Sequence, residues 1–285
     1  MKRILVTGAN GQLGKELRDI APSYPEVDFL FLSREDLPIH HYELVRNTFD
    51  GFKPDYCINC AAYTAVDKAE QEAELAYIVN SESVGILAAV SKIHDCKFIH
   101  ISTDYVFAGD SPVPYKESDA TGPVSVYGKS KLAGEKEAIT QNPDSIIIRT
   151  SWVYSFYGNN FVKTMIRLMK ERNEISVVSD QIGSPTWAAD LALFIMHVIE
   201  FPEWKQGVYH FSNLGEISWY DFAVEIKKLI QSNCIVHPIP TSAYPTPAKR
   251  PAFSLLDKTK IKSVFGYEPP SWKPSLEQCV HRLLA

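Results

Sequence analysis

A regular alternation of short apolar runs and helical segments in the first 150 residues constrains this chain more than any other feature. Five runs have the length and composition of buried strands, and four longer segments between them have helical character. The runs span residues 3–6, 28–32, 56–59, 97–101 and 145–149, and the helical segments span 13–20, 42–49, 74–92 and 126–139. Because strands that alternate with helices are joined by right-handed crossovers, we predict an α/β fold with a doubly wound parallel sheet.

A glycine-rich loop, TGANGQLG, follows the first run and opens the first helix. Gly8 permits a tight turn, Gly11 lets a pyrophosphate approach the backbone, and Gly14 allows the helix to pack closely on the strand. The amides of Gly11, Gln12 and Leu13 are expected to face phosphates at the helix N-terminus. In this strand–turn–helix context the loop predicts a dinucleotide site of Rossmann type, with a bare tight turn as the alternative.

The pattern changes after residue 150. One strand stands out at 208–211, and helical patterns cover residues 161–171, 187–199 and 219–230. The segment Pro238–Pro251 holds five of the 18 prolines and is expected to form an extended or lid-like loop. We therefore predict an NAD(P)-binding Rossmann domain at residues 1–150 and a smaller α/β C-terminal lobe, mainly for substrate, at 151–285. The helix near 160–172 could return to the first domain.

Charge and composition argue against several classes of protein. A formal net charge of −5 disfavours a non-specific nucleic-acid binder. No apolar run approaches the roughly 18 residues of a membrane span, and the apolar stretch after Met1 ends at Val6, too early for a signal peptide. We therefore expect a cytoplasmic protein without a membrane or nucleic-acid partner. Cys57 and Cys60 have redox or zinc spacing, but no second pair follows, so structural cysteines and no metal site are predicted.

The residues after the second strand bear on which dinucleotide binds. In this fold an acidic residue there grips the ribose 2′-hydroxyl of NADH, whereas an arginine accommodates the 2′-phosphate of NADPH. Arg34 follows Ser33 and favours NADPH, while Glu35 and Asp36 come next and keep NADH open. Asp36 and Leu37 are also expected to contact the adenine from a loop.

Three polar side chains could carry the chemistry. Tyr127 and Lys131 lie four residues apart in a helical segment, so both should emerge on one face. A lysine ammonium beside a phenol is expected to lower the phenol's pKa, which suits proton transfer near neutral pH. The fourth strand leads into Ser102, Thr103 and Asp104 at the carboxyl edge, where ligands bind in such sheets, and the Thr103 hydroxyl could hold a carbonyl oxygen.

This constellation resembles the extended short-chain dehydrogenase/reductase family and, within it, the dTDP-4-dehydrorhamnose reductases. The resemblance runs nearly from end to end. It is carried by the motifs NCAAYTAVDKAE from Asn59, STDYVF from Ser102, YGKSKLAGE from Tyr127, RTSWVY from Arg149 and DQIGSPT from Asp180, and by Arg250-Pro251.

The resemblance implies a reduction. NADPH, or alternatively NADH, would deliver hydride to the C4 carbonyl of the nucleotide sugar dTDP-4-dehydro-6-deoxy-L-mannose, giving dTDP-L-rhamnose in the last step of its biosynthesis. Tyr127 would be the general acid, Lys131 would lower its pKa and hold the nicotinamide ribose, and Thr103 would orient the carbonyl. Further residues that the resemblance assigns are Ala62, Tyr63 and Thr64 in the cofactor cleft, and Asp104, Trp152 and Arg250 at the substrate.

Several alternatives stay open at the level of sequence. Trp152 could belong to the core, Asp104 could cap a turn, and Arg250 could only pin a loop. The alternative functions are a related epimerase or dehydratase, and a non-catalytic, cofactor-binding regulatory subunit. A dehydratase would usually need further acidic groups beside Thr103, and no glutamate follows Asp104. We also expect a homodimer. Some relatives bind magnesium at a dimer interface, for which this sequence shows no carboxylate cluster.

Overall fold

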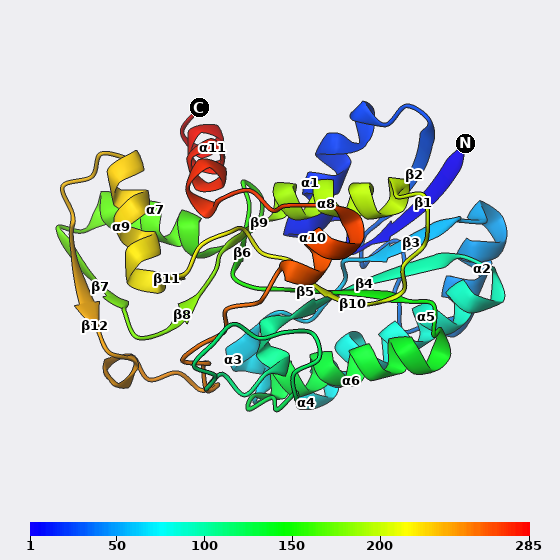
Figure 1. Cartoon of the computed structure of the whole chain (residues 1–285), viewed down its shortest axis with the longest axis horizontal. Coiled ribbons are helices and arrows are strands. Elements are labelled where there is room, and N and C mark those ends of the chain that lie inside the picture. Colours follow the sequence, from blue (N-terminus) through cyan, green and yellow to red (C-terminus); the bar gives the residue numbers. More distant parts are fainter.

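The computed structural model describes all 285 residues and confirms the predicted α/β class. Its central sheet has six strands in the order β10-β5-β4-β3-β1-β2, and every neighbouring pair is parallel (Figure 1). The strands are β1 (Lys2–Thr7), β2 (Val27–Leu32), β3 (Tyr56–Asn59), β4 (Lys97–Thr103), β5 (Ile146–Thr150) and β10 (Gly207–His210). Successive residues of β1 pack on opposite sides: Ile4 and Val6 enter one apolar cluster, and Leu5 enters another.

Helices cover both faces of this sheet, as the crossovers require. One face carries α1 (Gln12–Ile20) and α8 (Ala188–Glu200), and the other carries α2 (Tyr42–Phe52), α5 (Ser83–Ile93) and α6 (Val126–Gln141) (Figure 1). The chain reverses its winding direction between β1 and β3. Ligands bind at such a switch point, outside the carboxyl ends of the strands. The loops after β1, β3 and β4 therefore define the place to look for a site.

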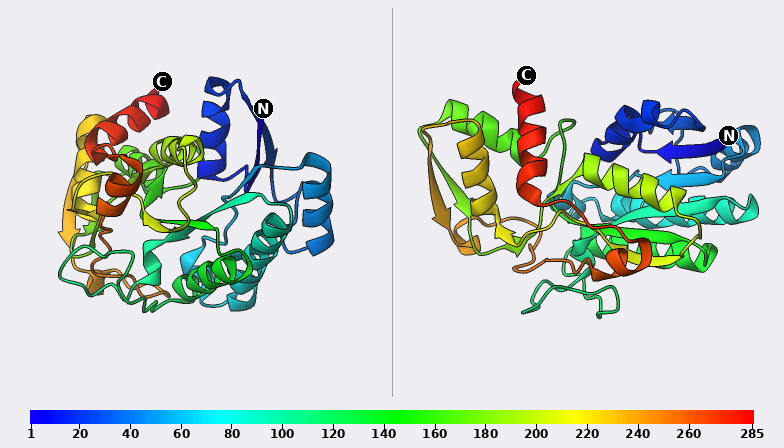
Figure 2. Two further views of the ribbon diagram at one scale, coloured as in Figure 1. Left: turned by 45° about the vertical axis from the view of Figure 1, so that its right-hand side comes forward. Right: turned by 45° about the horizontal axis from the view of Figure 1, so that its top comes forward.

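A second lobe lies beside the carboxyl ends of the strands, as Figures 1 and 2 show. Its core is a separate cluster of 18 buried residues, largely from three helices and β7. The elements are α7 (Phe161–Glu171), α9 (Trp219–Leu229), α11 (Trp272–Leu284), β6 (Val153–Tyr154), β7 (Glu174–Val178), β8 (Ile182–Gly183), β9 (Thr186–Trp187), β11 (Ile217–Ser218) and β12 (Ile235–Ile239). Most of these strands are only two residues long, which is too short for a periodic signal in the sequence.

The sheet lobe does not end at residue 150. Strand β10 pairs with β5, and α8 packs on α1, although both come later in the chain. The helix for which a return was considered, α7, instead packs on α9 in the second lobe. Tyr209 of β10 and the apolar side chains of α8 enter the same buried cluster as Ile4 of β1 and Leu17 of α1, so both elements complete the sheet lobe.

One helical stretch, Ala73–Ile93, is apolar and long enough to cross a membrane by length and composition. Half of its apolar window is buried in the protein, and α5 packs against α6 and α2, as a core helix does. The stretch consists of α4 (Ala73–Tyr77), a π-helical turn (Ile78–Glu82) and α5. The remaining helices are α3 (Val66–Ala69), α10 (Thr259–Phe265) and three 3-10 turns at Ala21–Ser23, Asp104–Val106 and Thr241–Ala243.

Candidate active site

The glycine loop has the close contacts that its spacing predicted. Gly8 has φ +66°, and a Cβ there would lie 2.6 Å from the backbone nitrogen of Ala61, in the loop after β3. A Cβ on Gly14 would lie 2.6 Å from the carbonyl oxygen of Gly8. Backbone occupies both spaces, so neither position accepts a side chain without a shift of the chain. The loop therefore forms a tightly packed cradle at the switch point. A tight turn without a binding role would not require close backbone contacts at both glycines.

Helix α1 begins after Gly11 with no side-chain cap, so its first amides are available to an anion. The amide of Gly11 differs from expectation, because it donates to the Gly8 carbonyl at 2.9 Å and holds the turn. Gln12 reaches the second lobe, where its Oε1 accepts from Asn160 Nδ2 at 3.0 Å. The buried Leu13 packs in the core beneath the loop. The cradle thus fits a dinucleotide pyrophosphate through the helix N-terminus.

After β2, the carboxylates of Glu35 and Asp36 are hydrogen-bonded, whereas the Arg34 guanidinium makes no ion pair. Asp36 accepts from the backbone amide of Ser33 at 2.9 Å, and Glu35 accepts from its hydroxyl at 2.8 Å. Arg34 is exposed and makes no ion pair within 4 Å. The Leu37 side chain is buried in the same apolar cluster as Leu5 of β1. This position does not support the expected contact between this side chain and the adenine.

The loop after β3 is held by a residue that the sequence did not single out. Buried Asn80, in the π-helical turn, accepts from the Tyr63 amide at 2.8 Å and donates to the Tyr63 carbonyl at 3.0 Å. It also donates to Ser130 Oγ on α6 at 3.0 Å. Ala62 is half-buried and Thr64 exposed in the same loop. Since π turns are common at functional sites, the turn was a signal only a structure could provide.

Thr103 and Asp104 stand at the carboxyl end of β4. The Thr103 hydroxyl accepts from the Tyr105 amide at 3.2 Å and donates to Asp104 Oδ1 at 3.0 Å. Asp104 is 2% exposed, and its Oδ2 is buried without a hydrogen-bond partner. Burial raises the pKa of this carboxyl to about 6, against the lowering effect of its hydrogen bonds. These hydrogen bonds come chiefly from Ser254 and Thr103, so the Ser254 hydroxyl lies near the carboxylate, and a substrate hydroxyl would be a further partner for Oδ2.

Tyr127 faces this strand end from α6. Burial raises its pKa to about 12, and a hydrogen bond with Thr103 opposes that rise. The ring meets Tyr105 edge-on at 5.5 Å. The expectation that Lys131 lowers the tyrosine's pKa is wrong for this structure, because burial dominates and the Lys131 Nζ is directed elsewhere. Lys131 Nζ donates to the carbonyl of Ile101 at 2.6 Å and lies 3.2 Å from His100 Nε2.

Trp152 is half-buried and follows β5 with φ 49°, an uncommon conformation for a side chain of this size. Its ring stacks on Trp219 of the second lobe with centroids 3.7 Å apart. A Cβ on Gly183 would lie 2.8 Å from the Trp152 ring and 2.9 Å from Ser254 Oγ. The strained backbone and the close glycine hold the indole against the edge of the second-lobe core, so Trp152 is partly a core residue, as the alternative held.

Arg250 comes from the proline-rich loop and pairs with Asp67 of the short helix α3, with Nη2 to Oδ2 at 2.7 Å. Asp67 also accepts from the Ala248 amide at 3.2 Å, so it pins the loop at two points. The other guanidinium nitrogen, Nη1, is buried without a partner. Arg250 therefore fixes the position of a loop, as the structural alternative proposed, and its Nη1 donors remain free for an anion.

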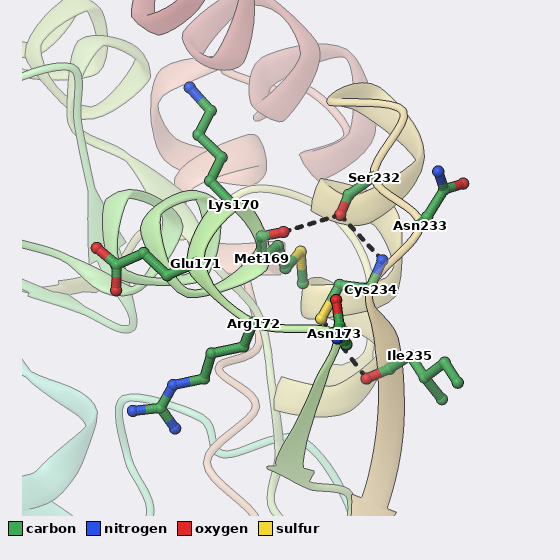
Figure 3. Close-up of a pocket in the computed structure, with 9 residues that line it drawn as sticks. All are labelled: Met169, Lys170, Glu171, Arg172, Asn173, Ser232, Asn233, Cys234 and Ile235. Atoms are coloured by element: carbon green, nitrogen blue, oxygen red, sulfur yellow. Dashed lines mark hydrogen bonds between the residues drawn. The ribbon is translucent and has the colours of Figure 1, made fainter.

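The structure brings Thr103, Asp104, Tyr127 and Arg250 to one region, since Tyr105 lies among all of them. Arg34 and Asp36 lie in the turn after β2, which is the edge strand of the sheet. No group of three or more His, Cys, Asp or Glu side chains is placed to hold a metal ion. A hollow at Met169–Asn173 and Ser232–Ile235 lies in the second lobe and contains none of the expected site residues (Figure 3).

Comparison with known proteins identifies the family of this chain. A family model described as the RmlD substrate binding domain matches residues 1–285. A dTDP-4-dehydrorhamnose reductase of Aggregatibacter actinomycetemcomitans is 45% identical over 287 residues, covering 97% of this chain and 98% of the relative. A crystal structure of such a reductase from Clostridium acetobutylicum has a TM-score of 0.96 at 42% identity, covering 99% of this chain and 100% of that one. One from Bacillus anthracis, in complex with NADP, has a TM-score of 0.94 at 42% identity, covering 99% of each. The chain therefore belongs to the RmlD family of dTDP-4-dehydrorhamnose reductases.

Proposed function

We propose that this chain reduces the C4 ketone of dTDP-4-dehydro-6-deoxy-L-mannose to dTDP-L-rhamnose with NAD(P)H, the last step of dTDP-rhamnose biosynthesis. The observation that carries the proposal is the meeting of Thr103 and Tyr127 at a strand end beside the glycine cradle, in a chain similar to such reductases along its whole length. When bound, the nicotinamide supplies the hydride. Every other requirement falls to side chains of this protein.

The cofactor would be held first by its phosphates. The first turn of α1 offers uncapped amides, and Gly8 and Gly14 keep the loop against the backbone. We propose that NADPH is preferred, because Arg34 is exposed and unpaired whereas Glu35 and Asp36 are engaged by Ser33. Ala62, Tyr63 and Thr64 would line the cleft, with the Tyr63 backbone fixed by Asn80.

Tyr127 would donate the proton to O4 of the sugar as hydride arrives at C4. Its raised pKa keeps the phenol protonated at neutral pH, so the acid is present before each turnover. Thr103 would hold the carbonyl oxygen in line with this proton. Lys131, whose Nζ is held by the Ile101 carbonyl and lies beside His100, would hold the nicotinamide ribose.

The substrate side would come from both lobes. Asp104 Oδ2 would accept from sugar hydroxyls, and Trp152, stacked on Trp219, would offer an aromatic surface to the substrate. Arg250 would fork onto the diphosphate with the donors that Asp67 leaves free. Apart from α8 and β10, which complete the sheet lobe, we further propose residues 1–150 as mainly cofactor-binding and 151–285 as mainly substrate-binding. We also propose a cytoplasmic location and a homodimer.

The test is a spectrophotometric assay of NADPH and NADH oxidation with the 4-keto sugar. Stoichiometric oxidation with rhamnose product, and none with dTDP-glucose, which has no C4 ketone, is the expected result. Turnover without net cofactor oxidation would point to an epimerase or dehydratase. Cofactor binding without reduction of any 4-keto nucleotide sugar would make the regulatory-subunit alternative correct.

A further inference from the structure

His100 is a fully buried histidine to which the proposed reaction gives no role. It lies on β4, three residues before Thr103, and is 0% exposed. Its Nδ1 lies 3.1 Å from Asn59 Nδ2 at the end of β3, and its Nε2 lies 3.2 Å from Lys131 Nζ on α6. The ring therefore joins the end of one strand to the lysine proposed to hold the cofactor.

The direction of this chain of hydrogen bonds is fixed by a backbone group. The amide N–H of Ala61 donates to Asn59 Oδ1 at 3.1 Å, and a backbone N–H cannot reverse its role. The Thr7 hydroxyl donates to the same oxygen at 2.7 Å. The Asn59 oxygen is thereby identified, and its Nδ2 must donate to His100. Nδ1 of the ring is then an acceptor.

In a neutral imidazole the hydrogen must therefore sit on Nε2, which faces Lys131 Nζ. An ammonium has three donors and no acceptor, whereas a neutral amine has a lone pair that can accept from Nε2–H. The same Nζ donates to Ile101, which either form can do. The hydrogen bonds that join Ala61, Asn59 and His100 therefore favour the neutral amine of Lys131 over its ammonium form.

The surrounding charges are few. Lys131 is approached by His100 from β4, by the Cys60 thiol after β3 and by Glu135 one turn further along α6. Burial lowers the pKa of Lys131 to about 8, although Glu135 and Cys60 oppose this. Burial also lowers the pKa of His100 well below its usual value, so the ring is neutral and must choose one tautomer.

We propose that His100 is a positioning residue that donates Nε2–H to Lys131 Nζ. The Asn59 amide fixes this tautomer of the ring and thereby favours the neutral amine form of Lys131. The consequence for turnover rests on the proposed function, because only there does the charge of Lys131 matter. His100 would then set the upper pH at which the site still works.

The tautomer can be read directly on the unaltered protein. Two-bond ¹H–¹⁵N correlations of ¹⁵N-histidine protein show which ring nitrogen carries the hydrogen, with His100 assigned by loss of its signals in His100→Gln. We expect hydrogen on Nε2. Hydrogen on Nδ1 overturns the proposal, whether or not the protein reduces a keto sugar.

A mutant cycle tests the effect on Lys131. In Asn59→Asp the carboxylate still accepts from Thr7 and Ala61 but cannot donate, so His100 should move its hydrogen to Nδ1 and accept from the ammonium. The Lys131 pKa, followed by ¹³Cε shifts and assigned with Lys131→Met, should rise by about one pH unit, a tenfold change in proton affinity. Most of this rise should vanish when His100→Gln is also present.

An equal rise with and without His100 would mean that the new carboxylate acts through space, and the proposal would be wrong. His210→Gln is the matched control, because His210 is also 0% exposed in the same sheet and bonds to Tyr115 instead. It should leave the Lys131 pKa unchanged. Failure of the reductase assay with Nε2–H present would count against the proposed function alone.

Discussion

The two lobes are built from the chain in different ways. The sheet lobe joins six strands into one continuous parallel sheet, whereas the strands of the second lobe form separate two-stranded sheets. Thr103 and Lys131 are accordingly held by a continuous sheet and its covering helix. Arg250 is held by one ion pair to Asp67. The difference suggests that the chemistry is placed rigidly, and that the substrate groups depend on a few polar contacts that can be removed singly.

Tyr127→Phe should have the largest effect, because it removes the proposed acid from the rigid lobe. We expect kcat to fall by about 10²- to 10⁴-fold while cofactor binding, measured by fluorescence titration, stays the same. Tyr105→Phe is the control, since its ring lies edge-on to Tyr127 and has no proposed step. Equal losses in the two variants would remove the catalytic assignment.

Arg149→Met should cost the most stability. The guanidinium pairs with Glu135 at 2.6 Å, and both side chains are at most 5% exposed. Removing one partner leaves a buried carboxylate, and we expect unfolding to become easier by about 3–5 kcal/mol in denaturant titrations. Arg167→Met breaks the exposed pair with Glu171 in the second lobe and should cost at most about 0.5 kcal/mol. Similar costs would contradict the contrast between the lobes.

Asp104→Asn should change how stability depends on pH. The folded pKa of about 6 lies above the usual 3.8, so the native state binds the proton more tightly than the unfolded chain. This contribution is complete below about pH 4 and is lost as pH rises through 6, on the order of 3 kcal/mol by pH 8. Asparagine cannot ionise. The variant should gain stability over the wild type between pH 4 and 8, and parallel curves would refute the raised pKa.

Arg250→Met should have the smallest effect on the fold and a clear effect on substrate. Its ion pair is partly exposed, with side chains 20% and 40% accessible, so stability should change by less than about 1 kcal/mol. Loss of a charged hydrogen bond to phosphate should raise KM about tenfold or more. Asp67→Asn keeps the guanidinium and should raise KM little. If it raised KM as much, loop closure and not phosphate contact would explain the effect.

Much of the site could be predicted because its signals are local. The spacing of Gly8, Gly11 and Gly14 and the four-residue interval from Tyr127 to Lys131 depend only on turn and helix geometry. The position of Thr103 follows from the end of an apolar strand. Asn80 and Trp219 could not be found this way, because their roles arise from contacts with residues 17 and 67 positions away.

The sequence by itself determined the alternation of strands and helices, the glycine loop and the identity of the proposed catalytic side chains. Each of these depends on the spacing of apolar residues or on the backbone conformation of residues close together in the chain. Only the tertiary structure decided that β10 and α8 complete the sheet lobe, that Arg250 meets Asp67, and that Lys131 turns toward His100. These are pairings of distant segments, chosen by burial and by the direction of hydrogen bonds. The reversed expectation for the pKa of Tyr127 has the same cause, because burial outweighs a charge whose orientation the sequence does not specify.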